Sequence, residues 1–215
     1  MSLFEGRDLI CVRGERRVFE GLDFALPEGG ALLLTGPNGS GKSSLLRLMT
    51  GLLTPAGGAL LWDGKPAAED PEAHRGRLCY LGHLDAVKPV LTGEENLAFW
   101  AALGGGGAAG VARALDGFAL GPLGDVPGRL LSAGQKRRVA LARLLVARAE
   151  VWLLDEPTVG LDRDSIERLK AAIAEHRAGG GRVVIATHVS PELPEAETLA
   201  LETFAPAPVP LEAGW

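Results

Sequence analysis

The stretch Gly36-Pro37-Asn38-Gly39-Ser40-Gly41-Lys42-Ser43 decides the fold, because it forms a complete G-x-x-x-x-G-K-[ST] phosphate-loop motif. The short apolar run at residues 31–35 before it predicts a buried strand, and residues 44–51 after it are typical of a helix closed by a glycine. A strand, a glycine-rich turn and a helix are the context that this motif requires. The stretch therefore predicts a nucleotide-binding site; the alternative is a glycine-rich turn that matches by chance.

The residue types in this loop suit the binding of phosphate. Gly39 and Gly41 allow the backbone to curl so that successive N–H groups point at phosphate oxygens, and the helix N-terminus adds partial positive charge. Lys42 is expected to reach the β- and γ-phosphates, and the hydroxyl of Ser43 to hold Mg²⁺. The expected ligands are a nucleotide, identified as ATP by the family resemblance described below, and Mg²⁺. The expected binding residues of the loop are Gly36, Pro37, Asn38, Gly39, Ser40, Gly41, Lys42, Ser43 and Ser44.

Composition limits the possible partners. The net charge is −5 with acidic and basic residues mixed along the chain, which is unlike the basic footprint of a nucleic-acid binder. Cys11 and Cys79 are isolated, which indicates that there is no disulfide framework. The N-terminal residues lack the apolar stretch of a signal peptide, and no apolar run approaches the ~20 residues that span a bilayer. We expect a cytoplasmic protein that binds no nucleic acid and reaches a membrane only through a partner.

The first part of the chain predicts mainly strands. Residues 7–26 alternate loosely and predict two antiparallel strands joined near residues 13–16. Residues 59–62 and 77–82 predict further short strands, and the polar residues 67–76 between them are expected to be exposed. The side chains of the first two strands that we expect to point inward are Leu9, Val12, Val18, Leu22, Phe24 and Leu26.

The middle of the chain predicts an inserted helical lobe at residues 89–147, which carry only helical patterns. The glycines at 104–107 are expected to form a flexible linker within the lobe. Ser132 fits a helix N-cap, and the helix that it opens should run to about residue 147. We expect one domain, with a nucleotide-binding core at residues 1–88 and 148–204, the lobe at 89–147 and an extended, proline-rich tail at 205–215.

The last part of the chain completes an α/β pattern. Residues 151–154 are a continuous apolar run, residues 182–187 predict a second buried strand, and residues 164–178 between them predict an amphipathic helix. Strands that alternate with helices predict a mostly parallel sheet that is covered on both faces. The expected fold is thus a parallel core with an antiparallel β subdomain and the helical lobe.

Three strands end in polar residues, namely the phosphate loop, Asp155-Glu156 and His188. Ligands of such sheets lie at the carboxyl ends of the strands, so these groups should converge. Asp155 is the expected second anchor for Mg²⁺, and Glu156 could polarise the attacking water as a general base. Taken alone, Glu156 could be a surface carboxylate and His188 a loop histidine. Beside a phosphate loop, we expect catalytic roles for Glu156, His188 and Lys42, with His188 as a sensor of the γ-phosphate.

The segment Leu131-Ser132-Ala133-Gly134-Gln135 resembles the signature motif L-S-G-G-Q of ATP-binding cassette (ABC) ATPases, with Ala133 in place of the first glycine. The phosphate loop, the lobe, this signature, Asp155-Glu156 and His188 follow the order of that family. The resemblance implies a P-loop NTPase of the ABC type. It also implies that Ser132, Gly134 and Gln135 bind the γ-phosphate of ATP held by a second copy of the chain. One loop and one signature per chain then imply a homodimer with two composite sites.

Two departures from the common pattern narrow the family. Arg13 stands where most relatives place an aromatic residue that stacks on adenine, and a guanidinium can also stack on a base. His83 stands where glutamine is usual, and a neutral imidazole can still bind water or Mg²⁺-bound water, so His83 is a further catalytic candidate. With these features the chain resembles the CcmA family, the ATPase subunits of cytochrome c maturation described as haem exporters.

Membership of that family would imply a membrane-embedded CcmB-like subunit with CcmC-like and CcmD-like proteins. The chain would then lie peripherally on the cytoplasmic side of a bacterial inner membrane, and its ATP hydrolysis would drive haem export or the release of a haem-loaded chaperone. The segment 83–97 is the expected docking surface for the membrane partner. No haem-ligand pattern is present, so no direct haem binding is expected. Three alternatives stay open, namely the ATPase subunit of another ABC exporter, a soluble ABC ATPase that acts on DNA or the ribosome, and a cassette that binds nucleotide without turnover.

Overall fold

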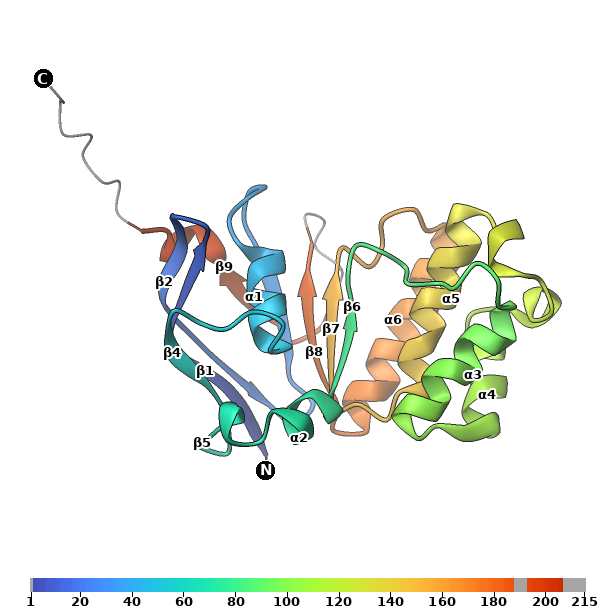
Figure 1. The fold of residues 1–215 in the computed structure, drawn as a ribbon, viewed down its shortest axis with the longest axis horizontal. Coiled ribbons are helices and arrows are strands. Elements are labelled where there is room, and N and C mark those ends of the chain that lie inside the picture. The colour runs from blue at the N-terminus through green and yellow to red at the C-terminus, as the bar shows by residue number, and fades with distance from the viewer. Residues whose placement is uncertain (1, 188–192, 207–215) are drawn as a thin grey trace, which may run out of the picture.

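The computed structural model describes residues 2–187 and 193–206. Its central sheet has five parallel strands among these residues, in the order β6-β7-β8-β3-β9 (Figure 1). This confirms the predicted α/β class with a parallel core. The sequence did not predict the edge strand β9, because it carries no apolar run; Leu199 is its one buried residue. The strands are β6 (Leu78–Leu81), β7 (Val151–Asp155), β8 (Arg182–Ala186), β3 (Ala31–Thr35) and β9 (Glu197–Ala200).

The helices cover both faces of this sheet. Within the predicted lobe, the structure places α3, α4 and α5, which confirms its helical character (Figure 1). The helices of the described residues are α1 (Lys42–Met49), α2 (Pro71–Gly76), α3 (Gly93–Gly104), α4 (Gly107–Gly117), α5 (Ala133–Val146) and α6 (Arg163–Ala178). Single 3₁₀ turns lie at η1 (Ala67–Glu69), η2 (Gly121–Leu123), η3 (Gly128–Leu130) and η4 (Leu201–Phe204).

The parallel strands separate two apolar cores, which explains their uninterrupted apolar sequences. In β7, Trp152 and Leu154 face the core that α5, α6 and the lobe build, whereas Val151 and Leu153 face a second core that includes α1. Figure 1 shows α1 between the parallel sheet and the antiparallel sheet, with α5 and α6 on the other side. The sheet is thereby held from both faces, and its carboxyl edge becomes a rigid platform for the loops.

An antiparallel sheet packs over α1 and confirms the predicted hairpin. It has the order β2-β1-β4-β5, with β1 at Leu3–Arg13, β2 at Arg16–Pro27, β4 at Gly57–Trp62 and β5 at Lys65–Pro66. The inward position expected for Val12 is wrong, since its exposed fraction is 37%. The pairing of β1 with β2 shifts register on both sides of Cys11, and such a bulge breaks the strict alternation of faces. Cys11, only 1% exposed, takes the inward place instead.

The glycines at 104–107 are a packed turn, so the expected flexible linker is wrong. The turn connects α3 to α4 and lies against the end of α5. A Cβ atom on Gly106 would lie 2.2 Å from the carbonyl oxygen of Val146, and Gly105 adopts a left-handed φ of 74°. Glycine is therefore required here because the backbones approach closely, and any side chain at position 106 would push the lobe helices apart.

The expected exposed segment 67–76 instead contains η1, α2 and the buried residue His74. The hydrogen bonds of His74 fix its neutral form, because Nε2 donates to the Met49 carbonyl (2.9 Å) and Nδ1 accepts from Trp62 Nε1 (3.0 Å). The ring of Trp62 in turn stacks on Phe4 at a centroid distance of 4.6 Å. Burial lowers the pKa of His74, and the nearby Arg75 and Arg77 lower it further.

This network predicts a loss of stability in mild acid. The folded-state pKa of His74 lies below the unfolded value, so the stabilisation is complete above about pH 6.5 and declines as the pH falls below that value. The effect amounts to about 1.4 kcal/mol for each unit by which the pKa is lowered. Urea unfolding between pH 8 and pH 5 should show a steeper acid loss for the wild type than for His74→Gln. Because His176 titrates in both proteins, only the difference is diagnostic, and parallel curves would contradict the prediction.

Two sequence expectations concern residues outside those described, namely His188 and residues 207–215 of the tail. Ser132, by contrast, is confirmed as the N-cap of α5, since its hydroxyl accepts a hydrogen bond from the Gln135 N–H. In the part of the chain that the structure describes, no helix has the length and apolar character needed to cross a membrane.

Candidate nucleotide site

A cavity of about 440 Å³ lies at the carboxyl edge of the parallel sheet, where the loops after β3 and β7 meet. It brings together most of the residues that the sequence singles out from the phosphate loop, from the end of β7 and from the segment after β6. The described residues that line it are Arg13, Arg16, Val18, Asn38, Gly39, Gly41, Lys42, Ser43, Ser44, Arg47, His83, Asp155 and Glu156.

The phosphate loop is folded for an anion. Lys42 is only 7% exposed, and its Nζ donates to the carbonyl oxygens of Gly36 (2.7 Å) and Pro37 (3.2 Å). Gly41 has a φ of 108°, and a Cβ atom there would lie 2.7 Å from Val18 Cγ1, so no other residue fits without displacement. No side chain caps the N-terminus of α1 at Gly41. The free N–H groups of the first helical turn therefore remain for a ligand.

Two further observations fit phosphate and a divalent cation. The Ser40 Oγ atom is buried and has no hydrogen-bond partner among the described residues, which suits a hydroxyl that awaits a phosphate oxygen. The Ser43 hydroxyl donates to Asp155 Oδ1 at 3.1 Å, so the two expected Mg²⁺ ligands already lie side by side. Asp155 itself is 6% exposed at the end of β7. Oxygen ligands of this kind are those that Mg²⁺ prefers.

Glu156 has an unusual backbone, with a positive φ of 46°. Such a conformation disfavours non-glycine residues and persists only where the surroundings hold it. Here the Glu156 N–H donates to the Ala186 carbonyl at the end of β8 (2.8 Å), and its carbonyl accepts from Arg137 Nη2 (2.8 Å). The turn directs the side chain into the same cavity as His83, which is exposed. His188, the third expected catalytic residue, lies outside the described residues.

The cavity also contains arginines that the sequence did not single out. Arg13, the expected adenine partner, lines the cavity together with Arg16 and Arg47. Arg16 begins β2 just across the hairpin from Arg13, and Arg47 lies on α1 one turn beyond the phosphate loop. Their positions beside the hairpin tip and the loop helix are the signal that could have identified them.

Tyr80 is a further neighbour that the sequence reasoning missed. Burial raises the pKa of its hydroxyl, and the carboxylate of Asp155 raises it further. Its hydroxyl interacts with both Asp155 and Arg47. Since Tyr80 lies on β6 directly beside β7, its place in a short apolar strand gives little sign of this contact in the sequence.

The signature residues lie apart from this cavity. Ser132 is exposed, and with Gln135 it forms a reciprocal capping box at the N-terminus of α5. Neither they nor Gly134 are among the residues that line the cavity around Lys42. Ala133 instead borders a small adjoining space of about 150 Å³, which it shares with Val159 and Gly160 and with His83 and Glu156 of the larger cavity, but with no residue of the phosphate loop. One copy of the chain thus does not bring the signature residues to its own phosphate loop.

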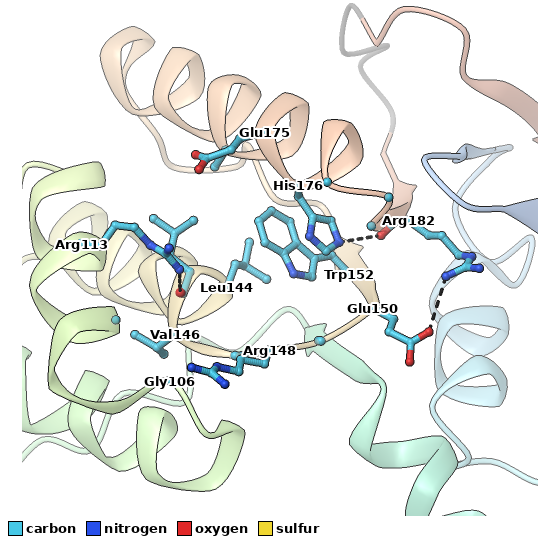
Figure 2. A pocket seen from close by; sticks show the side chains of 18 of the residues that line it. Gly106, Arg113, Leu144, Val146, Arg148, Glu150, Trp152, Glu175, His176 and Arg182 are labelled. Carbon is cyan, nitrogen blue, oxygen red and sulfur yellow. Dashed lines mark hydrogen bonds and ion pairs between the residues drawn. The ribbon is translucent and has the colours of Figure 1, made fainter. Parts of the chain in front are cut away.

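A larger cleft of about 810 Å³ lies at the opposite edge of the sheet, between α4, the end of α5 and α6 (Figure 2). Figure 2 shows the imidazole of His176 stacked on the indole of Trp152, with ring centroids 3.9 Å apart and nearly parallel planes (3°). Arg113 and Arg148 lie on the lobe side of the cleft (Figure 2). None of the predicted site residues lines it. The smaller cavity therefore remains the candidate site, since it holds the polar groups that phosphate chemistry needs.

Comparison with known proteins identifies the family. A family model described as ABC transporter matches residues 19–159. The cytochrome c biogenesis ATP-binding export protein CcmA of Rhodospirillum rubrum is 62% identical over 207 residues, which cover 96% of this chain and 89% of that protein. The CcmA protein of Paramagnetospirillum magneticum is 57% identical over 210 residues, with 96% and 97% covered.

A solved structure agrees with these relatives. A putative ABC transporter ATP-binding protein from Pyrococcus furiosus matches with a TM-score of 0.83 at 27% identity, and the match covers 95% of this chain and 100% of that chain. The fold, the order of the motifs and the full-length relatives agree with the resemblance read from the sequence. The chain is therefore an ATP-hydrolysing subunit of the ABC transporter family and belongs, within it, to the CcmA proteins.

Proposed function

We propose that this chain energises a membrane complex of cytochrome c maturation, by which haem is exported or a haem-loaded chaperone is released. The observation that carries the proposal is the cavity in which Lys42, Ser43, Asp155 and Glu156 converge in a chain whose full-length relatives are cytochrome c biogenesis ATP-binding export proteins. The two alternatives, namely the ATPase subunit of another ABC exporter and a soluble ATPase that acts on DNA or the ribosome, have no comparable support in those relatives. The intact polar groups of the cavity also favour turnover over mere nucleotide binding.

In the proposed site, the phosphate loop from Gly36 to Ser44 encloses the phosphates of ATP, and Lys42 exchanges its two carbonyl partners for phosphate oxygens. Ser43 and Asp155 would hold Mg²⁺, which when bound neutralises charge on the phosphates. The described residues contain no group of three or more His, Cys, Asp or Glu side chains that could hold a metal by itself. Phosphate oxygens and water would therefore complete this set of ligands.

The catalytic and adenine-binding candidates each have a role in the proposed reaction. Glu156 accepts the proton of the attacking water, a contribution of about 10²–10⁴ in rate for a well-placed general base. His83 lines the same cavity and orients that water through a ring nitrogen. His188 contacts the γ-phosphate in this proposal. Arg13 stacks on the adenine, and Arg16 beside it adds positive charge at the same end of the cavity.

The proposed active form is a two-fold dimer. Ser132, Gly134 and Gln135 would bind the γ-phosphate of the ATP held by the other copy, because the N-terminus of α5 attracts anions. Two exposed apolar side chains support a contact surface there, since Leu130 (67% exposed) precedes the signature and Val159 (59% exposed) borders the same small space as Ala133. Residues 1–88 and 148–204 would act as the nucleotide-binding core and residues 89–147 as the lobe.

The proposed membrane partner is a CcmB-like subunit, accompanied by CcmC-like and CcmD-like proteins, at the cytoplasmic side of the bacterial inner membrane. We assign the docking surface to segment 83–97, where Leu84 (80% exposed) and Val90 (74% exposed) present apolar side chains. Asp85 of this segment is half-buried and paired with Arg137, so it is not free for a partner. We propose neither a haem site nor a nucleic-acid site on this chain.

Charge reversal at Lys88 tests this docking surface. Lys88 is exposed, its Nζ lies 4.4 Å from the centroid of the Phe99 ring, and its backbone is held by the side chain of Asn96. We expect Lys88→Glu to reduce recovery with membranes by about tenfold or more. The new carboxylate would repel the partner group that the ammonium group of Lys88 attracts, and such a contact between like charges costs well over about 1.4 kcal/mol. The ATPase rate of the isolated subunit should stay at the wild-type level.

Sedimentation of membranes from cells that express the variant measures this effect, and Lys65→Glu on the exposed strand β5 is the matched control. Equal recovery of the Lys88→Glu and Lys65→Glu variants would contradict the assignment of the docking surface. A parallel fall in ATPase rate would mean that segment 83–97 supports the fold instead.

A further inference from the structure

Arg137 lies on α5, two residues after Gln135, the last residue of the signature, and is only 6% exposed. Its Nη2 donates to the carbonyl oxygens of Asp155 (3.3 Å) and Glu156 (2.8 Å). Its Nη1 donates to the carbonyl oxygen of Gly82 (3.3 Å) and to Asp85 Oδ1 (3.1 Å). One guanidinium thus joins three parts of the molecule, namely the signature helix, the end of β7 and the segment after β6.

One of these contacts is made to a non-glycine residue whose backbone lies in the left-handed region. Glu156 has the positive φ of 46°, and its carbonyl accepts the bond from Arg137 (2.8 Å) and a longer one from the Val159 N–H (3.3 Å), while its own N–H donates to Ala186. A planar guanidinium reaches two pairs of acceptors from two separate nitrogens, which a single ammonium group does not. The guanidinium thus makes the shorter of the two bonds to the Glu156 carbonyl, and it links the direction of the Glu156 side chain to the signature helix.

We infer that Arg137 is the positioning residue for the general base. It holds Glu156 in its strained turn and ties that turn to residues 82–85, at the start of the proposed docking segment. A displacement of that segment moves Gly82 and Asp85, and through Arg137 it moves the carboxylate that activates water. The inference rests on the proposed role of Glu156 and names the contact by which a membrane partner would regulate it.

Arg137→Lys is the primary variant, because it keeps the buried charge and the long side chain but loses the fork of donors. We expect kcat to fall by about 10²-fold, since a displacement of about 1 Å in a catalytic group has that effect. The Kd for ATP should not change, because Arg137 does not line the cavity. A selective fall in kcat separates positioning from a general loss of folding.

Arg143→Lys is the matched control. Arg143 lies on the same helix, is 5% exposed, donates to the backbone carbonyl of Tyr80 and packs on Trp100. Its hydrogen bond within the described part of the chain goes to Tyr80 and not to Asp155 or Glu156. It should lower the melting temperature as much as Arg137→Lys does and leave kcat near the wild-type value. If both variants lower kcat and the melting temperature in parallel, the inference is overturned.

Two further measurements sharpen the test. In a Glu156→Gln background, Arg137→Lys should lower the residual rate little further, because both changes act on the same group. Asp85→Asn, at a side chain that is 28% exposed, should leave the melting temperature unchanged and give a kcat between those of wild type and Arg137→Lys. Full additivity in the double variant, or a wild-type kcat in Arg137→Lys, overturns the inference. Wild-type turnover in Glu156→Gln alone would instead overturn the proposed role of Glu156.

Discussion

Replacing Glu156 with glutamine is expected to lower the ATP turnover rate by about 10²–10⁴-fold while ATP still binds. Glutamine keeps the size and shape of the side chain but does not accept the proton of the attacking water. The turn itself should persist, because its hydrogen bonds run through the backbone to Ala186 and Arg137. With hydrolysis stopped, the ATP-bound dimer should accumulate.

Rate measurements and size-exclusion chromatography with ATP and Mg²⁺ test both parts of this prediction. His83→Gln is the matched control, since it changes a polar group in the same cavity to the residue usual in the wider family and should retain most of the turnover. A Glu156→Gln protein that elutes only as a monomer with ATP would count against the composite-site dimer. Turnover close to that of the wild type would show that another group activates the water.

The second large effect is expected for Lys42→Ala, which should abolish tight ATP binding. The ammonium group is 7% exposed and already held by two loop carbonyls, so it is placed for phosphate before the ligand arrives. Truncation of one partner in a buried, charged pair costs about 2–5 kcal/mol, which corresponds to roughly 30- to 4,000-fold in Kd.

Titration with a fluorescent ATP analogue measures the change in affinity. Lys65→Ala removes an exposed lysine from β5 and controls for the loss of one positive charge. The melting temperature without nucleotide should be compared in both variants, because the loop carbonyls of Gly36 and Pro37 lose a donor in Lys42→Ala. Affinity near the wild-type value in a folded Lys42→Ala protein would disprove the assigned role.

The sequence was sufficient for the elements whose signal is local. The phosphate loop, the buried strands β7 and β8 and the N-cap Ser132 each carry their own pattern within a few residues. The features that it did not predict depend on contacts between distant residues. The burial of His74 beside Met49 and the close approach of Gly106 to Val146 arise from packing partners far away in the chain, and the bulge at Cys11 arises from the pairing of β1 with β2.

The same distinction applies to the candidate site. Motifs predicted the groups that would touch phosphate or metal, because those residue types stand at fixed spacing. Tyr80 and Arg137 were missed, because they act through contacts with Asp155 and Glu156 across 18 or more positions of the chain. No spacing rule covers such pairs, and only the packing of α5 and β6 beside β7 brings them together.

The burial of β7 on both faces also restricts how far Asp155, at the end of this strand, could move along the strand axis. Residues 151–154 of this strand face the two cores in alternation, so a slip of one position would exchange Trp152 and its neighbours between different cores. The smallest slip that keeps the faces is two residues, or about 6.6 Å at roughly 3.3 Å per residue. Such a step would carry Asp155 out of reach of Ser43, which now lies 3.1 Å away. The carboxylate therefore has one permitted height along the strand axis, and fine adjustment is left to the side chains and loops beyond the sheet.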